Sequence, residues 1–179
     1  MGVAAEGIRS ASVTVSGQTR LDGESLLLNG AGVRTLFGFR VYVAELYLPA
    51  LTHEVERILD RDMPRRLRLT LLRDTTTDQN LDALRTGMTD NNSESEMAAI
   101  KLEVARFFGL IRQVSKVPAG TVIQLDYQPG AGTWLSIGER NLGLIAGDKF
   151  NRALMKIWLG ADPIQTSLKK SLLGLVAEH

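Results

Sequence analysis

Two residues in one strongly apolar stretch have the chemistry to bind an anion. The stretch is LNGAGVRTLFGFRVYVAELYLPA, residues 28–50, and it contains Arg34 and, eight residues later, Tyr42. A guanidinium is a planar fork of donors that matches a carboxylate, and the pairing strengthens where water is excluded. The phenol of Tyr42 could donate a second hydrogen bond to the same anion. The sequence therefore predicts a cation at the end of an apolar pocket. Two alternatives stay open for Arg34, a surface position on an edge strand and a structural ion pair with a carboxylate such as Asp74.

The motifs of common catalytic, metal and cofactor sites are absent from the sequence. There is no G-x-S-x-G, P-loop, H-E-x-x-H or C-x-x-C motif, and residues 30–38, GAGVRTLFG, do not match a dinucleotide fingerprint. The chain has no cysteine, and its two histidines, His53 and His179, lie far apart, so we expect no metal and no cofactor. Lys and Arg total 21 against 20 for Asp and Glu, and no basic stripe is present. This charge balance argues against nucleic-acid binding.

The polar run RDTTTDQN, residues 73–80, is dense in hydroxyl and carboxylate groups. Such a run could suggest phosphate or metal chemistry. Ser, Thr and Asp also gather at helix N-termini, where their side chains accept hydrogen bonds from free backbone amides. We interpret the run as the start of a helix rather than as a site.

Alternation and turn residues predict the strands that must position Arg34 and Tyr42. In residues 65–73, RRLRLTLLR, leucines alternate strictly with polar residues over 66–71, which is typical of a half-buried strand. Further strands are expected within 12–17 and on both sides of a turn at Asp22–Gly23, where the second strand ends at Asn29–Gly30. A bend at Gly38 is expected to separate two more strands. Residues 120–147 are expected to form three strands, with turns at Pro129–Gly130 and Gly138–Glu139.

Helical periodicity predicts helices between these strands. The longest is 93–114, which begins with a capping box of Ser93 and Glu96 and carries an apolar stripe that we expect to pack on the sheet. A helix is expected in 51–62, with Thr52 as its N-cap and Pro64 after its end. Another is expected in 148–160, with Asp148 as its N-cap and Gly160 ending it. Two more are expected in 74–92 and in 162–174. Strands, then helices, then a strand meander and two helices predict an α+β fold with an antiparallel sheet.

The whole chain of 179 residues has the size of one domain, so we expect a single domain over 1–179 with its core at about 12–174. No apolar run reaches the roughly 18 residues of a membrane helix, and we expect no stable membrane insertion. Residues 3–7, VAAEG, resemble the stub left after signal-peptide cleavage, with Met1 and Gly2 added before it. This interpretation predicts a periplasmic or secreted protein. The alternative is an ordinary flexible terminus on a cytoplasmic protein.

Three segments together resemble the chalcone isomerase-like proteins, and most closely their bacterial branch. They are LNGAGVRTLFGFRVYVAELYLP (28–49), LDYQPGAGTWLSIGERNLGLIAG (125–147) and FNRALMKIWLGADPIQTSLKKSLLG (150–174). The resemblance implies an open-faced β-sandwich, in which a large antiparallel sheet carries a layer of helices and a ligand cleft lies between them. It also implies one of two functions, chalcone cyclisation as in the plant isomerases or fatty-acid binding as in related plastid proteins.

The resemblance assigns roles to individual residues. Arg34 matches the arginine that holds the ligand's anionic oxygen in both branches, and Tyr42 matches the tyrosine that assists it in the fatty-acid binders. The tyrosine and asparagine that line the isomerase site fall near Asn80 and Gly87, and are therefore replaced. We expect a non-catalytic binding protein for a fatty acid or similar amphipathic carboxylate, with an isomerase-type intramolecular lyase as the alternative. Arg40 is expected to lie solvated at the rim. The oligomeric state is not predicted.

Overall fold

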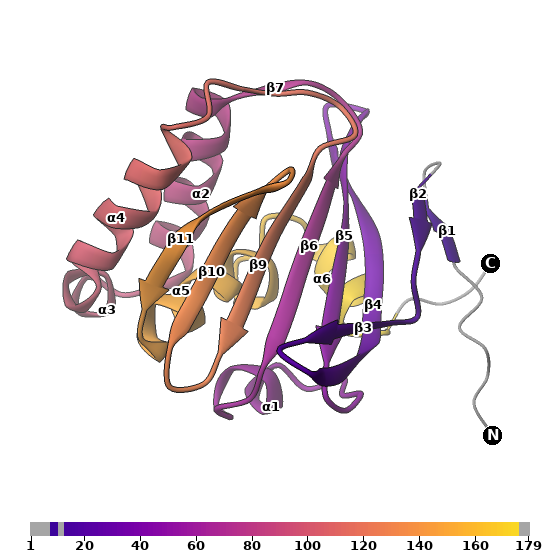
Figure 1. Cartoon of the computed structure of the whole chain (residues 1–179), viewed down its shortest axis with the longest axis horizontal. Helices are drawn as coiled ribbons and strands as arrows, with labels where there is room; N and C mark the ends of the chain where they lie inside the picture. Colours follow the sequence, from indigo (N-terminus) through magenta and orange to yellow (C-terminus); the bar gives the residue numbers. More distant parts are fainter. Residues whose placement is uncertain (1–7, 11–12, 176–179) are drawn as a thin grey trace.

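The computed structural model describes residues 8–10 and 13–175, and a seven-stranded antiparallel sheet forms its centre (Figure 1). The strands of this sheet are β3 (Gln18–Leu21), β4 (Glu24–Leu36), β5 (Phe39–Leu48), β6 (Arg65–Leu71), β9 (Val122–Gln128), β10 (Gly132–Ile137) and β11 (Arg140–Ala146). Their order across the sheet is β11-β10-β9-β6-β5-β4-β3. Two small two-stranded sheets pair β1 (Ile8–Ser10) with β2 (Val13–Val15), and β7 (Thr75–Thr76) with β8 (Lys116–Val117). The stub interpretation of residues 3–7 falls outside the described residues.

Helices cover one face of the sheet. They are α1 (Val55–Leu59), α2 (Thr77–Asn91), α3 (Glu94–Ala99), α4 (Lys101–Ile111), α5 (Asp148–Leu159) and α6 (Thr166–Leu172). In Figure 1, α5 and α6 lie behind the sheet and α2, α3 and α4 form a group beside β11. The main core lies between this helical layer and the sheet, and Phe107, Phe150 and Trp158 are among its buried side chains. The predicted α+β class with an antiparallel sheet is confirmed.

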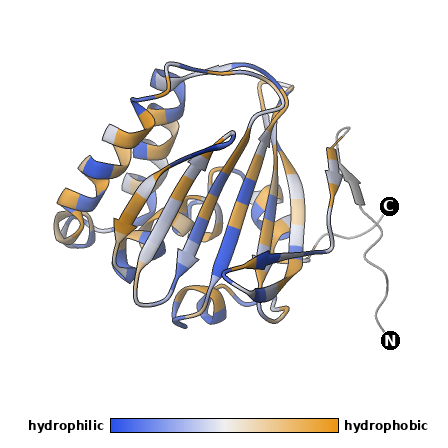
Figure 2. Ribbon diagram, in the orientation of Figure 1, coloured by the Kyte–Doolittle hydropathy of each residue, from blue (hydrophilic) through white to orange (hydrophobic). Residues whose placement is uncertain are grey.

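Strand alternation gives the sheet two chemically different faces. On β6, Leu67, Leu69 and Leu71 belong to the core under the helices. Arg66 and Arg68 point to the opposite side, which we call the outer face. The ribbon coloured by hydropathy shows this alternation along β6 (Figure 2). The prediction of a strand with one leucine face over 65–73 is therefore confirmed.

The predicted end of a strand at Asn29–Gly30 is wrong. Strand β4 continues to Leu36, with a shift of register between Leu28 and Gly30. The glycine is needed for packing and not for a turn. A Cβ atom at Gly30 would collide with the backbone of Ser171 and Leu172 in α6. Glycine lets the last helix approach the strand closely, and sequence alone does not distinguish that use from a turn.

The predicted single helix over 93–114 is also wrong. Its capping box at Ser93 and Glu96 is confirmed, but the helix breaks at Ile100, whose φ and ψ are −117° and 20°. The first part, α3, buries none of its residues, whereas α4 buries Phe107, Phe108, Leu110 and Ile111 and contacts β11. The break therefore lets the second part alone pack on the sheet.

Two predicted helix caps are displaced in the structure. Helix α1 starts after Glu54, and the hydroxyl of Thr52 instead accepts a hydrogen bond from the Glu54 amide in the preceding turn, at 3.1 Å. The same helix already ends at Leu59, before Pro64. In α5, Asp148 is the first helical residue, where its negative charge complements the helix N-terminus. The interpretation of 73–80 is confirmed, because the Thr76 side chain caps α2 and forms a capping box with Gln79.

Candidate functional site

An apolar cavity lies between the sheet and helices α2, α4 and α5. Its volume is about 80 Å³. Three of its lining side chains carry a polar group, namely Tyr42, Asn80 and Trp158, and the rest are apolar: Leu69, Leu71, Ala83, Leu84, Phe107, Ile111, Val117, Ile123, Leu125, Leu135, Ile137, Ile157 and Ile164. Ala83 is exposed, so the cavity reaches the surface beside α2. A mostly apolar lining with a few polar groups is typical of a site for an amphipathic small molecule, but such sites usually measure roughly 300–1,000 Å³, so a fatty acid would have to widen this cavity.

Tyr42 supplies a buried hydroxyl to the cavity wall. The residue is 9% exposed, and its hydroxyl accepts a hydrogen bond from the indole Nε1 of Trp158 at 2.9 Å. Burial raises the pKa of Tyr42 to about 12, while the bond from Trp158 and the charge of Arg34 act in the lowering direction. The hydroxyl therefore keeps its proton at neutral pH. Since this proton has no acceptor among the described residues, Tyr42 can donate it to a ligand.

Arg34 lies directly opposite Tyr42 on the neighbouring strand, as its register partner between β4 and β5. Its Nη1 atom is within hydrogen-bond distance of Thr35 O and Ile164 O, both at 3.1 Å, and of Gln165 Oε1 at 3.3 Å. All three acceptors are uncharged. Within the described part of the chain, Arg34 forms no ion pair and its Nε and Nη2 groups have no acceptor. Arg34 is half-buried and does not line the cavity, whereas Ile164, whose carbonyl accepts a hydrogen bond from Arg34, does.

Both alternatives for Arg34 can now be compared with the structure. Asp74 does not pair with Arg34, because its Oδ1 atom accepts a hydrogen bond from the Ala119 amide at 2.8 Å. Strand β3 pairs with β4 only over residues 24–27, so β4 is the edge of the sheet at Arg34, but Arg34 is half-buried and not fully exposed. Arg40, in contrast, is exposed. The anion-binding roles of Arg34 and Tyr42 stay predictions, but the two side chains do lie together.

The two positions that match the isomerase tyrosine and asparagine have different surroundings in the structure. Asn80 lines the cavity from α2 and donates from Nδ2 to the Thr75 hydroxyl at 3.0 Å. Gly87 is buried one helical stretch later, and a Cβ there would press on Ile157 of α5. The tight contact leaves no room for an asparagine side chain at Gly87 without displacing α5.

Sequence reasoning missed two residues of this site. Trp158 is the hydrogen-bond donor to Tyr42, and it comes from the amphipathic helix α5 far along the chain. Gln165 bridges the irregular end of β4, where the register shifts between Arg34 and Thr35. Its Oε1 accepts from the Thr35 amide at 2.8 Å and its Nε2 donates to Val33 O at 3.0 Å. The register shift leaves these backbone groups free, and no local pattern signals which distant residue binds them.

Comparison with known proteins agrees with this architecture. A family model described as chalcone isomerase-like matches residues 8–174. The chain belongs to the chalcone isomerase-like family. The crystal structure of a fatty-acid binding protein from Arabidopsis thaliana is similar, with a TM-score of 0.73 and 15% sequence identity over 94% of this chain and 96% of that chain. At this identity the similarity shows the fold, an open-faced sandwich of the chalcone isomerase type. A search of curated proteins finds no match.

The chalcone isomerase-like site contains no metal-binding constellation in the described residues, where no group of three or more His, Cys, Asp or Glu side chains could hold an ion. The polar groups at the cavity are instead a phenol, an indole, an amide and the nearby guanidinium. This set can donate hydrogen bonds and positive charge to an anion.

Proposed function

We propose that the protein binds a fatty acid or similar amphipathic carboxylate, with the hydrocarbon chain in the cavity and the carboxylate at Tyr42 and Arg34. The observation that carries the proposal is the combination of an apolar wall with a protonated Tyr42 hydroxyl and an arginine whose acceptors are all uncharged. The fatty-acid binding protein of the same fold supports it further.

The charge of Arg34 is the reason for choosing an anion. Its guanidinium is half-buried and, among the described residues, lacks a carboxylate partner. A partly dehydrated cation of this kind is stabilised by an anion that brings both charge and bidentate acceptors. Because Arg34 does not line the cavity and donates to the carbonyl of the lining residue Ile164, we expect the segment around Ile164 to move when the carboxylate binds.

The alternative function is chalcone cyclisation at the same cavity. That reaction needs polar groups that polarise the ketone and position water. At the two positions that match the isomerase groups, this chain has Asn80 and Gly87. We therefore expect no acceleration over the spontaneous reaction. A kcat/KM on the order of 10⁴ M⁻¹s⁻¹ or more, typical of an efficient enzyme, would contradict the binding function.

Titration with a fatty acid and with the alcohol of the same chain length tests the proposal directly. The two ligands share the hydrocarbon chain and differ in the head group. We expect the acid to bind at least about tenfold more tightly, because only the carboxylate gains the charge-assisted bonds. Equal affinity would mean that the cavity binds hydrocarbon without an anionic anchor.

A matched pair of variants locates the binding site. Leu84→Trp places a large side chain in the wall of the cavity, and Leu102→Trp places the same side chain on an exposed position of α4. We expect the first variant to lose fatty-acid binding and the second to retain it. Loss in neither variant would place the ligand elsewhere.

A further inference from the structure

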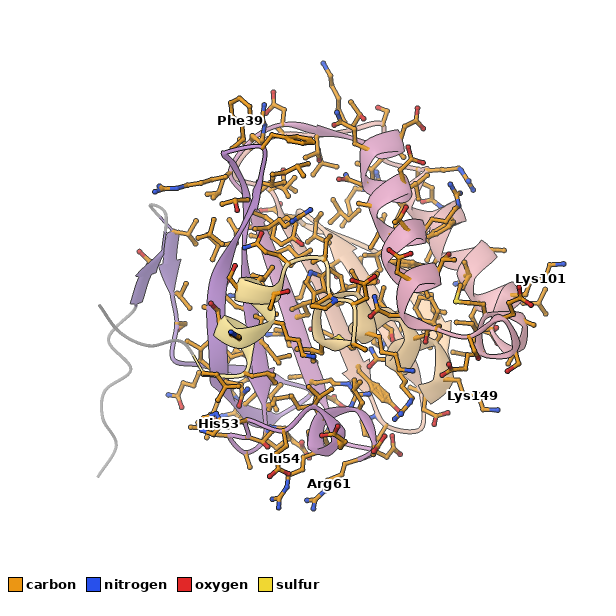
Figure 3. All side chains as sticks on the ribbon, turned by 180° about the vertical axis from the view of Figure 1, so that it is seen from behind. Phe39, His53, Glu54, Arg61, Lys101 and Lys149 are labelled. Carbon is orange, nitrogen blue, oxygen red and sulfur yellow. The ribbon has the colours of Figure 1, made fainter. Side chains whose placement is uncertain are left out.

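The turn between β4 and β5 exposes three large apolar side chains at the edge of the molecule. Leu36 is 46% exposed, Phe37 91% and Phe39 59%. We call these residues, together with Gly38, the hairpin tip. Figure 3 labels Phe39 at the outer surface, at the end of the molecule opposite His53 and Arg61. Single exposed apolar residues are ordinary, but a cluster at the end of one hairpin marks an interaction site.

The conformation of the hairpin tip is unfavourable for the residues that form it. Phe37 has a φ of 50° and Gly38 a φ of 79°, so the turn is of the type that requires two left-handed residues. Glycine adopts this conformation without strain, and Asn or Asp usually occupies the first position. A bulky phenylalanine there is uncommon. Neither local backbone preference nor burial within the chain accounts for Phe37, so its side chain points to a function outside the fold.

Positive charge adjoins the hairpin tip. Arg40 follows it on β5 and is exposed. The guanidinium of Arg73 lies over the Phe39 ring, 4.5 Å from its centroid. Asp74 is the nearest carboxylate in sequence to Arg73, and it is already bonded to the Ala119 amide. An apolar tip beside two exposed arginines complements a surface that has an apolar interior and anionic head groups.

The hairpin tip is also connected to the opening of the cavity. The amide of Leu72 donates to Val41 O at 2.9 Å, which fixes Arg73 beside the strand of Tyr42. The chain then runs from Arg73 through β7 into α2, whose residues Asn80 and Ala83 line the cavity. A contact made by the tip is therefore only a few residues from the cavity wall.

We propose that the hairpin tip docks the protein on anionic phospholipid membranes, with Phe37, Phe39 and Leu36 entering the interface and Arg40 and Arg73 facing the head groups. Side chains of this kind bind at the boundary between head groups and acyl chains, and basic residues add attraction to anionic lipid. In the described residues no helix is long and apolar enough to cross a bilayer. This inference is independent of the ligand proposed for the cavity.

Flotation of the full chain with vesicles tests the docking. We expect binding to vesicles of phosphatidylcholine with phosphatidylglycerol and much weaker binding to phosphatidylcholine alone. Phe37→Ser/Phe39→Ser should reduce partitioning about tenfold or more, through lost apolar burial. Arg40→Glu/Arg73→Glu should reduce it at least as strongly on anionic vesicles and reverse its dependence on salt, because salt then screens a repulsion.

Matched control variants separate the tip from general properties of the surface. Leu102→Ser removes an 82% exposed apolar side chain elsewhere, and Arg61→Glu/Lys101→Glu makes the same change of net charge away from the tip. Both controls should bind vesicles like the unmodified protein. Phe37→Trp gives a second measurement, since bromine-labelled acyl chains should quench its fluorescence when the side chain enters the bilayer.

Three results would overturn the docking proposal. The first is no binding to anionic vesicles, and the second is an equal loss of binding in the control and tip variants. The third is self-association in sedimentation velocity that depends on concentration and is abolished by Phe37→Ser/Phe39→Ser, in a protein that does not bind vesicles. The partner of the tip would then be a second copy of the chain. Fatty-acid titration of Phe37→Ser/Phe39→Ser should match that of the unmodified protein, because neither side chain lines the cavity, so this proposal and the cavity ligand are tested separately.

Discussion

Arginines on the two faces of the sheet are held in opposite ways. On the outer face, Arg66 donates from Nε and Nη2 to the two carboxylate oxygens of Asp126, at 2.7 and 3.0 Å. On the helix-facing side, the acceptors of Arg34 are two backbone carbonyls and the amide oxygen of Gln165. One cation is neutralised within the chain. The other has only uncharged acceptors among the described residues and can pair with an anion from outside.

The outer-face pair belongs to a closed network. Gln124 donates to Asp126 Oδ2 at 3.1 Å and accepts from Arg68 at 3.1 Å, and Arg66 also reaches the Thr19 hydroxyl at 2.6 Å. Gln124 and Asp126 come from the neighbouring strand β9 and Thr19 from the more distant β3, so folding itself completes the network. The difference between the faces suggests that Arg66 serves stability, whereas Arg34 serves a ligand, and each variant below tests one side of that contrast.

The largest expected effect is on stability. Asp126→Ala leaves the Arg66 charge without its partner, and the side chain of Arg66 is only 10% exposed. We expect a loss of about 3–5 kcal/mol in the free energy of unfolding, as for other broken buried pairs. Urea unfolding measures it. The double variant Arg66→Met/Asp126→Leu should recover most of the loss, and a loss below about 1 kcal/mol in Asp126→Ala would place this pair with the weak surface pairs.

Arg34→Ala should affect affinity instead. We expect it to weaken fatty-acid binding by about 2–4 kcal/mol, because truncation leaves the ligand carboxylate unpaired in a dry site. Arg34→Lys should recover only part, since an ammonium cannot form the bidentate pair. Arg40→Ala is the control, with a change under about 1 kcal/mol expected of an exposed charge. Equal losses at Arg34 and Arg40 in titrations with a fluorescent fatty acid would mean that the anchor is misassigned.

Tyr42→Phe should have a smaller effect, on both fatty-acid affinity and the stability of the fold. Loss of one hydrogen bond should cost about 1 kcal/mol of fatty-acid affinity. It also leaves the buried indole of Trp158 without its acceptor, so we expect about 1–2 kcal/mol less stability. The double variant Tyr42→Phe/Trp158→Phe removes donor and acceptor together and measures their coupling. If the two single losses simply add in the double variant, the hydrogen bond contributes nothing.

The smallest effect concerns Glu45, which is 2% exposed on the outer face and accepts from the Tyr47 hydroxyl at 2.8 Å. Burial raises the pKa of Glu45, with the bond from Tyr47 and the charge of Arg68 acting in the lowering direction. A raised pKa means that Glu45 contributes full stability below its unfolded pKa and loses it as the pH rises through its folded pKa. Glu45→Gln should therefore be more stable than the unmodified protein at pH 7, by about 1 kcal/mol or less.

Thermal unfolding across pH measures this effect of Glu45. The advantage of Glu45→Gln should vanish below about pH 4, the ordinary range of a glutamate carboxyl. An advantage that grows as the pH falls would have the opposite sign and would show that Glu45 is stabilised in its charged form.

The sequence predicted the parts of the fold that local patterns determine. Alternation on β6 and the turn at Gly38 depend on neighbouring residues, and both were found. The strand end at Asn29–Gly30 was wrong because the close approach of α6, from the other end of the chain, decides the use of Gly30. The break at Ile100 was missed for a similar reason, since an uninterrupted apolar stripe does not reveal where the sheet stops supporting the helix.

The candidate site was predictable only in part. The sequence predicts Arg34 and Tyr42 because a charge within an apolar run is conspicuous. Their pairing across β4 and β5 follows from the hairpin, and their role in binding stays a prediction. Trp158 and Gln165 contact them from more than a hundred residues away, and such contacts leave no spacing pattern. Nor does the sequence reveal that Tyr42 lines the cavity while Arg34 does not.

The contact between Trp158 and Tyr42 also gives the protein a built-in optical reporter. The chain has two tryptophans. Trp158 lines the cavity, whereas Trp134 pairs with Asp126 across β10 and β9 and so faces the other side of the sheet. Any molecule that enters the cavity and competes for the Tyr42 hydroxyl changes the surroundings of one indole and leaves the second as a reference. The intrinsic emission of the unlabelled protein can therefore follow occupancy in real time.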